Sequence, residues 1–285
     1  MLARRRDILA GLAIWPVVAR AQAQAMGDEC VGVVGALRDP FAAHFVFRGS
    51  TLVALASRHT TDPQSSTIAL LRRTFASTEP ALVLVEGLAT DAGSSPKGFA
   101  PQRGTDAFRG GESRYAAKLA NEAGQPFLGI EPRDQDINTD VLKSYKSEDI
   151  VGAFVLRAIR SRGLMLGQPP LELENYAQRT AERYMRGDTR LSNAFENFSG
   201  WYQMAYGRSP WADPKLRSRG SPCSQGLAGS VLKQITLLRN EHIALLIASV
   251  FPVTAKILLV FGSGHYRALA PLLEKRYGAP RYETV

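Results

Sequence analysis

Residues 256–269 read KILLVFGSGHYRAL: an apolar run, two glycines, a histidine and the start of a helical pattern. The unbroken apolar run Ile257 to Phe261 is typical of a strand buried on both faces, as in parallel sheets. The Gly-Ser-Gly sequence predicts a tight turn. His265 would then lie at the carboxyl end of the strand, where open α/β sheets form their ligand crevice. A histidine after such a glycine turn is also often only a hydrogen-bonded loop or core residue.

Three other segments repeat this layout, in which an apolar run is followed by a histidine or a glutamate. They are residues 51–59, TLVALASRH; residues 81–86, ALVLVE; and residues 125–131, QPFLGIE. Because the carboxyl ends of parallel strands meet at one edge of a sheet, we expect the side chains that follow these strands to converge. The converging residues would be His59, Glu86, Glu131 and His265.

Imidazoles and carboxylates together are a common ligand set for divalent transition metals. We therefore predict a site for Mn²⁺, Fe²⁺, Co²⁺ or Zn²⁺, with His59, Glu86 and His265 as its ligands. For Glu86 the alternative is a turn carboxylate that faces solvent. His44 lies between apolar neighbours, has no motif around it and is expected to be structural.

Two further residues are candidates for catalysis. Glu112 follows Gly110-Gly111 and opens a helical pattern; a carboxylate in a first helical turn also suits the helix dipole, which alone would explain it. Arg239 lies in the long helical pattern Leu227 to Phe251 and needs an anionic partner, because an unpaired buried charge is costly. We predict that a carboxylate of the strand-end group is that partner.

The alternation of strand and helix patterns predicts an α/β fold with a mainly parallel central sheet flanked by helices. A helical insertion is expected at about residues 147–226, and an aromatic run within it, from Phe195 to Tyr206, is expected to be core. Residues 88–111 are rich in Gly, Ser and Pro, and we interpret them as a lid-like loop over the carboxyl ends of the strands.

The N-terminus has the pattern of a secretory signal peptide. Arg4-Arg5-Arg6 precedes an apolar run, and small-x-small cleavage sites follow near residues 23 to 25. The paired arginines resemble the twin-arginine type, which exports folded proteins. Residues 1–25 would then be removed, leaving one domain over residues 26–285 in the periplasm. In that oxidising compartment Cys30 and Cys223 either form a disulfide or remain as two thiols.

Composition is that of an ordinary globular protein, with 285 residues, 45% of them apolar and 21% charged. The net charge of +9 falls to +6 when four Arg and one Asp leave with the signal peptide. The excess is spread along the chain without a basic-aromatic platform, which argues against nucleic acid as a partner. No segment of the expected mature chain reaches the length of a membrane span.

Together these motifs resemble the TraB family, which includes the GumN-like proteins and the TIKI metalloproteases. That family belongs to a superfamily with the ChaN haem-binding proteins and the erythromycin esterases of the EreA type. The resemblance covers roughly residues 50–280. It is carried by a histidine and then a glutamate after successive strands, by Gly-Glu opening a helix, by Arg-Asn in a long helix, and by Gly-Ser-Gly-His after the last strand. These are His59, Glu86, Gly111-Glu112, Arg239-Asn240 and residues 262–265.

The resemblance implies an α/β fold with its site at the strand ends and metal-dependent hydrolysis, of peptides in the TIKI branch. It implies that His59 and His265 bind metal or catalyse and that Arg239 is a buried arginine of the site. The acidic members of the site would be Glu86, Glu112 and Glu131. One position departs from the family, because its first motif is Gly-x-x-His and Ala56 replaces the glycine here.

Three functions remain open on the sequence. The first is an exported metal-dependent hydrolase of a small-molecule or peptide substrate, in which Glu112 or Glu131 is the general base and Arg239 stabilises negative charge. The second is a haem- or iron-binding protein, with Tyr115, Tyr266 or a histidine as axial ligand. The third is a non-catalytic protein that sequesters a peptide or signal, which the departure at Ala56 favours.

Overall fold

The computed structural model describes residues 30, 37–92, 99, 108, 110–161 and 170–285. The predicted signal peptide and most of the predicted lid-like loop lie outside these residues. The chain divides into two compact units. A sheet unit takes the chain up to Pro132 and again from Asn240 to Val285, and a helical unit takes Arg133–Arg239. The segment predicted as a helical insertion, 147–226, lies within the helical unit.

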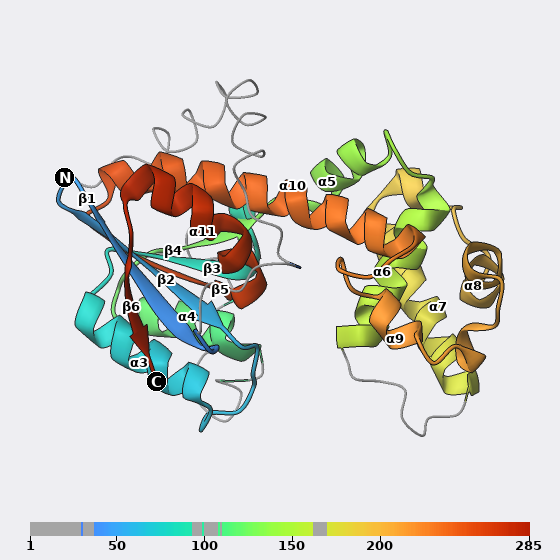
Figure 1. Ribbon diagram of the computed structural model, residues 1–285, viewed down its shortest axis with the longest axis horizontal. Coiled ribbons are helices and arrows are strands. Elements are labelled where there is room, and N and C mark those ends of the chain that lie inside the picture. The colour runs from blue at the N-terminus through green and yellow to red at the C-terminus, as the bar shows by residue number, and fades with distance from the viewer. Residues whose placement is uncertain (1–29, 31–36, 93–98, 100–107, 109, 162–169) are drawn as a thin grey trace. The chain divides into compact units, whose positions relative to one another are not determined.

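The sheet unit is built on six strands in the order β4-β3-β5-β2-β1-β6 (Figure 1). The four strands from β4 to β2 run parallel, while β1 and β6 pair antiparallel at one edge. This confirms the predicted α/β fold with a mainly parallel sheet. The strands are β1 Phe41–Phe47, β2 Ser50–Ser57, β3 Leu82–Ala89, β4 Phe127–Glu131, β5 Lys256–Gly262 and β6 Arg281–Thr284.

Helices cover both faces of this sheet. Helices α3, Ser66–Thr78, and α4, Gly111–Glu122, pack on one face. Helix α11, Ser263–Tyr277, and the end of α10, Leu227–Val250, pack on the other. Strand β5 lies between them, so its alternate side chains enter two different cores. That is why the run Ile257 to Phe261 is apolar without interruption.

The junction after β5 differs from the tight turn that the glycines predicted. Gly262 is the last strand residue and the N-cap of α11, with extended dihedral angles, φ −64° and ψ 144°. The helix begins at Ser263, so His265 lies in its first turn. Strand and helix meet without a loop, and the Gly262 N–H donates to the side chain of Glu86.

The helical unit has its own core. Its helices are α5 Asp134–Val141, α6 Ser147–Ser161, α7 Pro170–Gly187, α8 Phe198–Tyr206, α9 Leu216–Arg219 and the start of α10. Phe198, Trp201 and Tyr202 are buried in that core, which confirms the interpretation of the aromatic run as core. Helix α8 begins at Phe198, because the Asn197 side chain accepts the N–H of Gly200 and caps the helix there.

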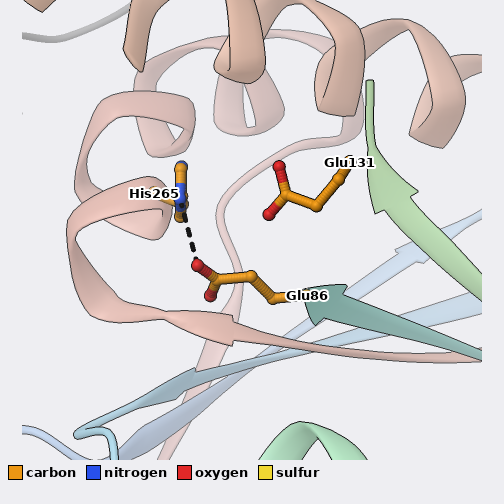
Figure 2. A group of neighbouring side chains, drawn as sticks. All are labelled: Glu86, Glu131 and His265. Carbon is orange, nitrogen blue, oxygen red and sulfur yellow. Dashed lines mark ion pairs between the residues drawn. The ribbon is translucent and has the colours of Figure 1, made fainter. Parts of the chain in front are cut away.

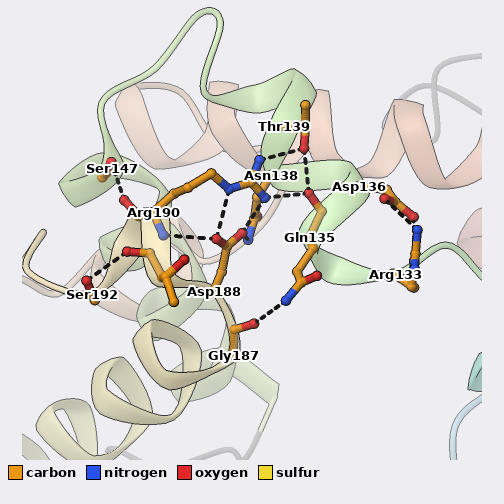
Figure 3. Close-up of polar contacts among 11 residues, drawn as sticks. Arg133, Gln135, Asp136, Asn138, Thr139, Ser147, Gly187, Asp188, Arg190 and Ser192 are labelled. Carbon is orange, nitrogen blue, oxygen red and sulfur yellow. Dashed lines mark hydrogen bonds and ion pairs between the residues drawn. The ribbon is translucent and has the colours of Figure 1, made fainter.

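An ion pair between the buried Asp188 and the exposed Arg190 ties the end of α7 to α5 (Figure 3). Asp188 is 4% exposed and accepts hydrogen bonds from Arg190 Nε at 2.9 Å and Nη2 at 2.6 Å, and from Asn138 Nδ2 at 3.1 Å. Arg190 also donates to the backbone oxygen of Gln135 and to Thr139 Oγ1. The hydrogen bond from Arg190 lowers the pKa of Asp188 to about 2.

Replacing Asp188 with asparagine is expected to lower the free energy of unfolding at neutral pH by about 1–3 kcal/mol, because Arg190 loses its charged acceptor. A lowered pKa means that the ionised Asp188 stabilises the fold above about pH 4, and that this contribution is lost as the pH falls toward about 2. Urea unfolding at several pH values checks both effects. Asp140→Asn, at the exposed Asp140–Lys143 pair, is the control and should change stability little.

Both cysteines are disulfide-bonded, and none of the described residues is a free cysteine. The thiol alternative is therefore wrong. Among the described helices, none combines the length and the apolar character needed to cross a membrane.

Candidate functional site

Three of the predicted site residues meet at the carboxyl edge of the sheet (Figure 2). Glu86 lies near the end of β3, Glu131 ends β4, and His265 opens the helix that follows β5. Because β4, β3 and β5 are neighbours and parallel, their carboxyl ends lie side by side. One ligand atom from each residue lies within 4.8 Å of the other two.

Hydrogen bonds orient two of these side chains. Glu86 Oε2 accepts the backbone N–H of Gly262 at 2.7 Å, which leaves Oε1 facing His265 Nε2 at 3.5 Å. His265 is 8% exposed, and its Nδ1–H donates to Asn240 Oδ1 at 2.5 Å. That bond selects the tautomer in which Nε2 carries a lone pair, as a metal-binding histidine requires.

The group fits a divalent metal. Two carboxylates and an imidazole are donors that Mn²⁺, Fe²⁺, Co²⁺ and Zn²⁺ all accept. Two donors on one such ion, each about 2.1 Å from it, lie about 3–4 Å apart. The 3.5 Å between Glu86 Oε1 and His265 Nε2 falls in this range. These donors can therefore hold a metal ion, and they do not distinguish among the four metals.

Thr90 holds the backbone of Glu131, and the sequence patterns did not indicate this residue. Thr90, in a short 3₁₀ turn after β3, donates its hydroxyl to the backbone oxygen of Glu131 at 3.3 Å. The same hydroxyl lies 2.8 Å from His242 Nε2 on α10. His242 and Asn240 both belong to the sequence Arg-Asn-Glu-His in α10. Four polar residues in an otherwise apolar helix are the pattern from which both could have been predicted as site residues.

His59 and Glu112 form a second pair. His59 Nδ1–H donates to Glu112 Oε1 at 2.6 Å, and this oxygen also accepts the Ser57 hydroxyl at 2.8 Å. Glu112 Oε2 accepts the backbone N–H of Thr60 at 3.1 Å. Glu112 is 2% exposed, and burial raises its pKa; the hydrogen bond from His59 and the backbone donors outweigh burial and leave the pKa below its ordinary value. The buried carboxylate is thus ionised and binds the Nδ1 edge of the imidazole.

The pair and the metal-binding group flank the same glycine. A Cβ atom built on Gly262 would lie 2.8 Å from His59 Nε2 and 3.5 Å from Glu86 Oε2. His59, Glu86 and Glu112 also line one cavity of about 750 Å³. The side chain of His59 is 66% exposed and lines this cavity. The site therefore combines a possible metal position with an accessible imidazole backed by a carboxylate.

The remaining residues that the sequence singled out are Arg239, His44 and two tyrosines. Arg239 is 8% exposed and is the last residue of the helical unit, so its predicted carboxylate partner stays a prediction. His44 Nε2–H donates a hydrogen bond to Glu283 Oε2 at 3.1 Å, in keeping with a structural role. The two tyrosines considered as haem ligands are buried and already hydrogen-bonded, Tyr115 to Arg72 and Tyr266 to Tyr282.

No protein-family model, curated protein or solved structure matches this chain. Fold and site together define an α/β protein whose sheet edge carries two carboxylates and an imidazole able to hold a metal ion.

Proposed function

We propose that the chain is an exported metal-dependent hydrolase of the TraB, GumN and TIKI kind, acting on a peptide or another small substrate. The observation that carries the proposal is the convergence of Glu86, Glu131 and His265 beside the His59–Glu112 pair. Metal ligands next to a carboxylate-backed imidazole are the components that hydrolysis of an acyl bond needs. Export rests on residues 1–25, which lie outside the described residues.

The geometry favours a different division of roles from the one expected on sequence. Glu86, Glu131 and His265 would hold the divalent ion, so Glu131 becomes a ligand rather than a base. The bound ion would polarise the substrate carbonyl and lower the pKa of water. His59, which was expected to be a ligand, is instead assigned the proton transfer, because it is not among the described residues whose donor atoms converge, Glu86, Glu131 and His265.

His59 would then act through its Nε2, since Nδ1–H is bound to Glu112. It takes a proton from the attacking water and passes it to the leaving group. Glu112 keeps the imidazole in the tautomer with Nε2 unprotonated and stabilises the imidazolium that forms. Ser57 and Thr60 each donate to Glu112, which holds the carboxylate in place during this step. Arg239 keeps its proposed role of stabilising negative charge.

The test is elemental analysis of the protein purified after export, followed by a screen of peptide and ester hydrolysis. We expect a transition metal bound in stoichiometric amount, and turnover that a chelator abolishes and added metal restores. A metal-free protein that takes up no Mn²⁺, Fe²⁺, Co²⁺ or Zn²⁺ and turns over none of the substrates would refute the proposal. Tight peptide capture without turnover would favour the sequestering alternative instead.

Gly262→Ala is expected to lower kcat/KM for the proposed hydrolysis by about 10- to 100-fold, because the new Cβ would displace the His59 ring from its position. The dihedral angles of Gly262 suit alanine, so the melting temperature should change little. Gly187→Ala is the matched control, since nothing lies within 4 Å of its Cβ position. Equal kinetics for the two variants would show that the His59 position does not matter.

A further inference from the structure

The helical unit contains a cavity of its own, of about 360 Å³. Three basic side chains and three serines line it, and none of its described lining residues is acidic. They are Arg160, Lys215, Arg219, Ser218, Ser221 and Ser224. We propose that this cavity is an anion site that binds a phosphate group, either free or carried by a small ester.

The basic residues come from two elements, α6 and α9, so the meeting of Arg160 with Lys215 and Arg219 is a tertiary feature. Arg160 lies in the last turn of α6, Lys215 immediately precedes α9, and Arg219 ends α9 (Figure 1). The helix dipole explains Arg160 by itself, because cations are favoured in a last turn. It does not explain why cations from two different helices line the same cavity. Like charges around one cavity repel each other, and a bound anion removes that cost.

Arg219 is held in place before any ligand arrives. Its Nε donates to Asp213 Oδ2 at 2.9 Å, and its guanidinium carbon lies 3.9 Å from the centre of the Tyr206 ring. Asp213 is itself fixed, because it accepts the hydroxyl of Tyr202 at 2.7 Å and the backbone N–H of Lys215 at 2.9 Å. Asp213 is buried and does not line the cavity, so its charge anchors Arg219 from behind. A fixed guanidinium loses less entropy when it binds an anion.

A phosphate group is the anion that these donors fit best. Guanidinium groups bind phosphate oxygens in pairs, and an ammonium group and hydroxyls add single donors. The cavity volume lies at the lower end of the range for small-molecule sites, which suits free phosphate or a small phosphate ester.

Titration calorimetry of the full chain tests the proposal, with inorganic phosphate and glycerol 2-phosphate as probes at constant ionic strength. We expect saturable binding of at least one probe, and the tighter probe identifies the free or the esterified ligand. Arg160→Gln and Lys215→Gln should each weaken binding about 10-fold, the loss of one charge-assisted contact. Arg160 and Lys215 are exposed, so these variants should fold normally.

Two controls decide where the probe binds. Arg217→Gln removes an exposed arginine of α9 that does not line the cavity and should leave affinity within about twofold. His265→Ala alters the sheet unit and should also leave phosphate affinity unchanged. The proposal is overturned if neither probe binds saturably, if Arg217→Gln weakens binding as much as Arg160→Gln, or if His265→Ala abolishes it.

Discussion

Replacing His265 with alanine is expected to remove the metal and to abolish the hydrolysis proposed for this protein. The variant deletes the only imidazole among the three described donors and leaves two carboxylates, Glu86 and Glu131. We expect metal affinity to fall by more than about 100-fold, because even loss of an outer partner of a ligand costs 10- to 100-fold. Elemental analysis after dialysis measures metal content directly, so the result does not depend on knowing the substrate.

One further variant should give a smaller loss of metal, and a second serves as the control. Asn240→Ala removes the acceptor that selects the tautomer of His265 and should weaken metal binding by about 10- to 100-fold. His44→Ala is the matched control, since His44 pairs with Glu283 on the antiparallel side of the sheet and should keep the wild-type metal content. Full metal stoichiometry in His265→Ala would reject the proposed ligand set.

Replacing His59 with alanine is expected to lower kcat by about 10²–10⁴-fold while metal content stays unchanged. The reason is that the variant removes the proposed proton acceptor and leaves Glu86, Glu131 and His265 intact. Glu112→Gln should lower kcat in the same direction, because a neutral amide stabilises the imidazolium of His59 less well. Steady-state kinetics and elemental analysis on the same preparations separate the two effects.

The control for this experiment is Glu122→Gln, at the exposed end of the same helix as Glu112, which should keep wild-type kinetics. Added imidazole should restore part of the activity of His59→Ala, since the side chain that it replaces is 66% exposed in the cavity. Loss of metal from His59→Ala would instead return His59 to the ligand role that the sequence suggested. A wild-type rate in His59→Ala would remove it from the mechanism.

Much of the sheet unit could be predicted because local patterns specify it. Apolar runs at 51–56, 81–85 and 257–261 each form a strand, and all belong to the parallel part of the sheet. Parallel strands place their following residues on one edge, so two strand-end carboxylates and His265 could be expected to meet. Glu112 was likewise predictable in the first turn of α4.

The division of these residues into two groups could not be predicted. His59 and His265 both follow strands, yet His59 binds Glu112 whereas His265 binds Asn240. The partners are separated by 53 and 25 positions along the chain, and no local pattern records such pairs.

By itself, then, the amino-acid order specified the parallel strands, the aromatic core of the helical unit and the list of titratable side chains at the strand ends. These follow from periodicity and burial, which depend on near neighbours in the chain. Only the tertiary structure decided which imidazole faces which carboxylate, and that three cations surround one cavity in the helical unit. Those pairings depend on strand order and helix packing, which bring together residues that are far apart in sequence.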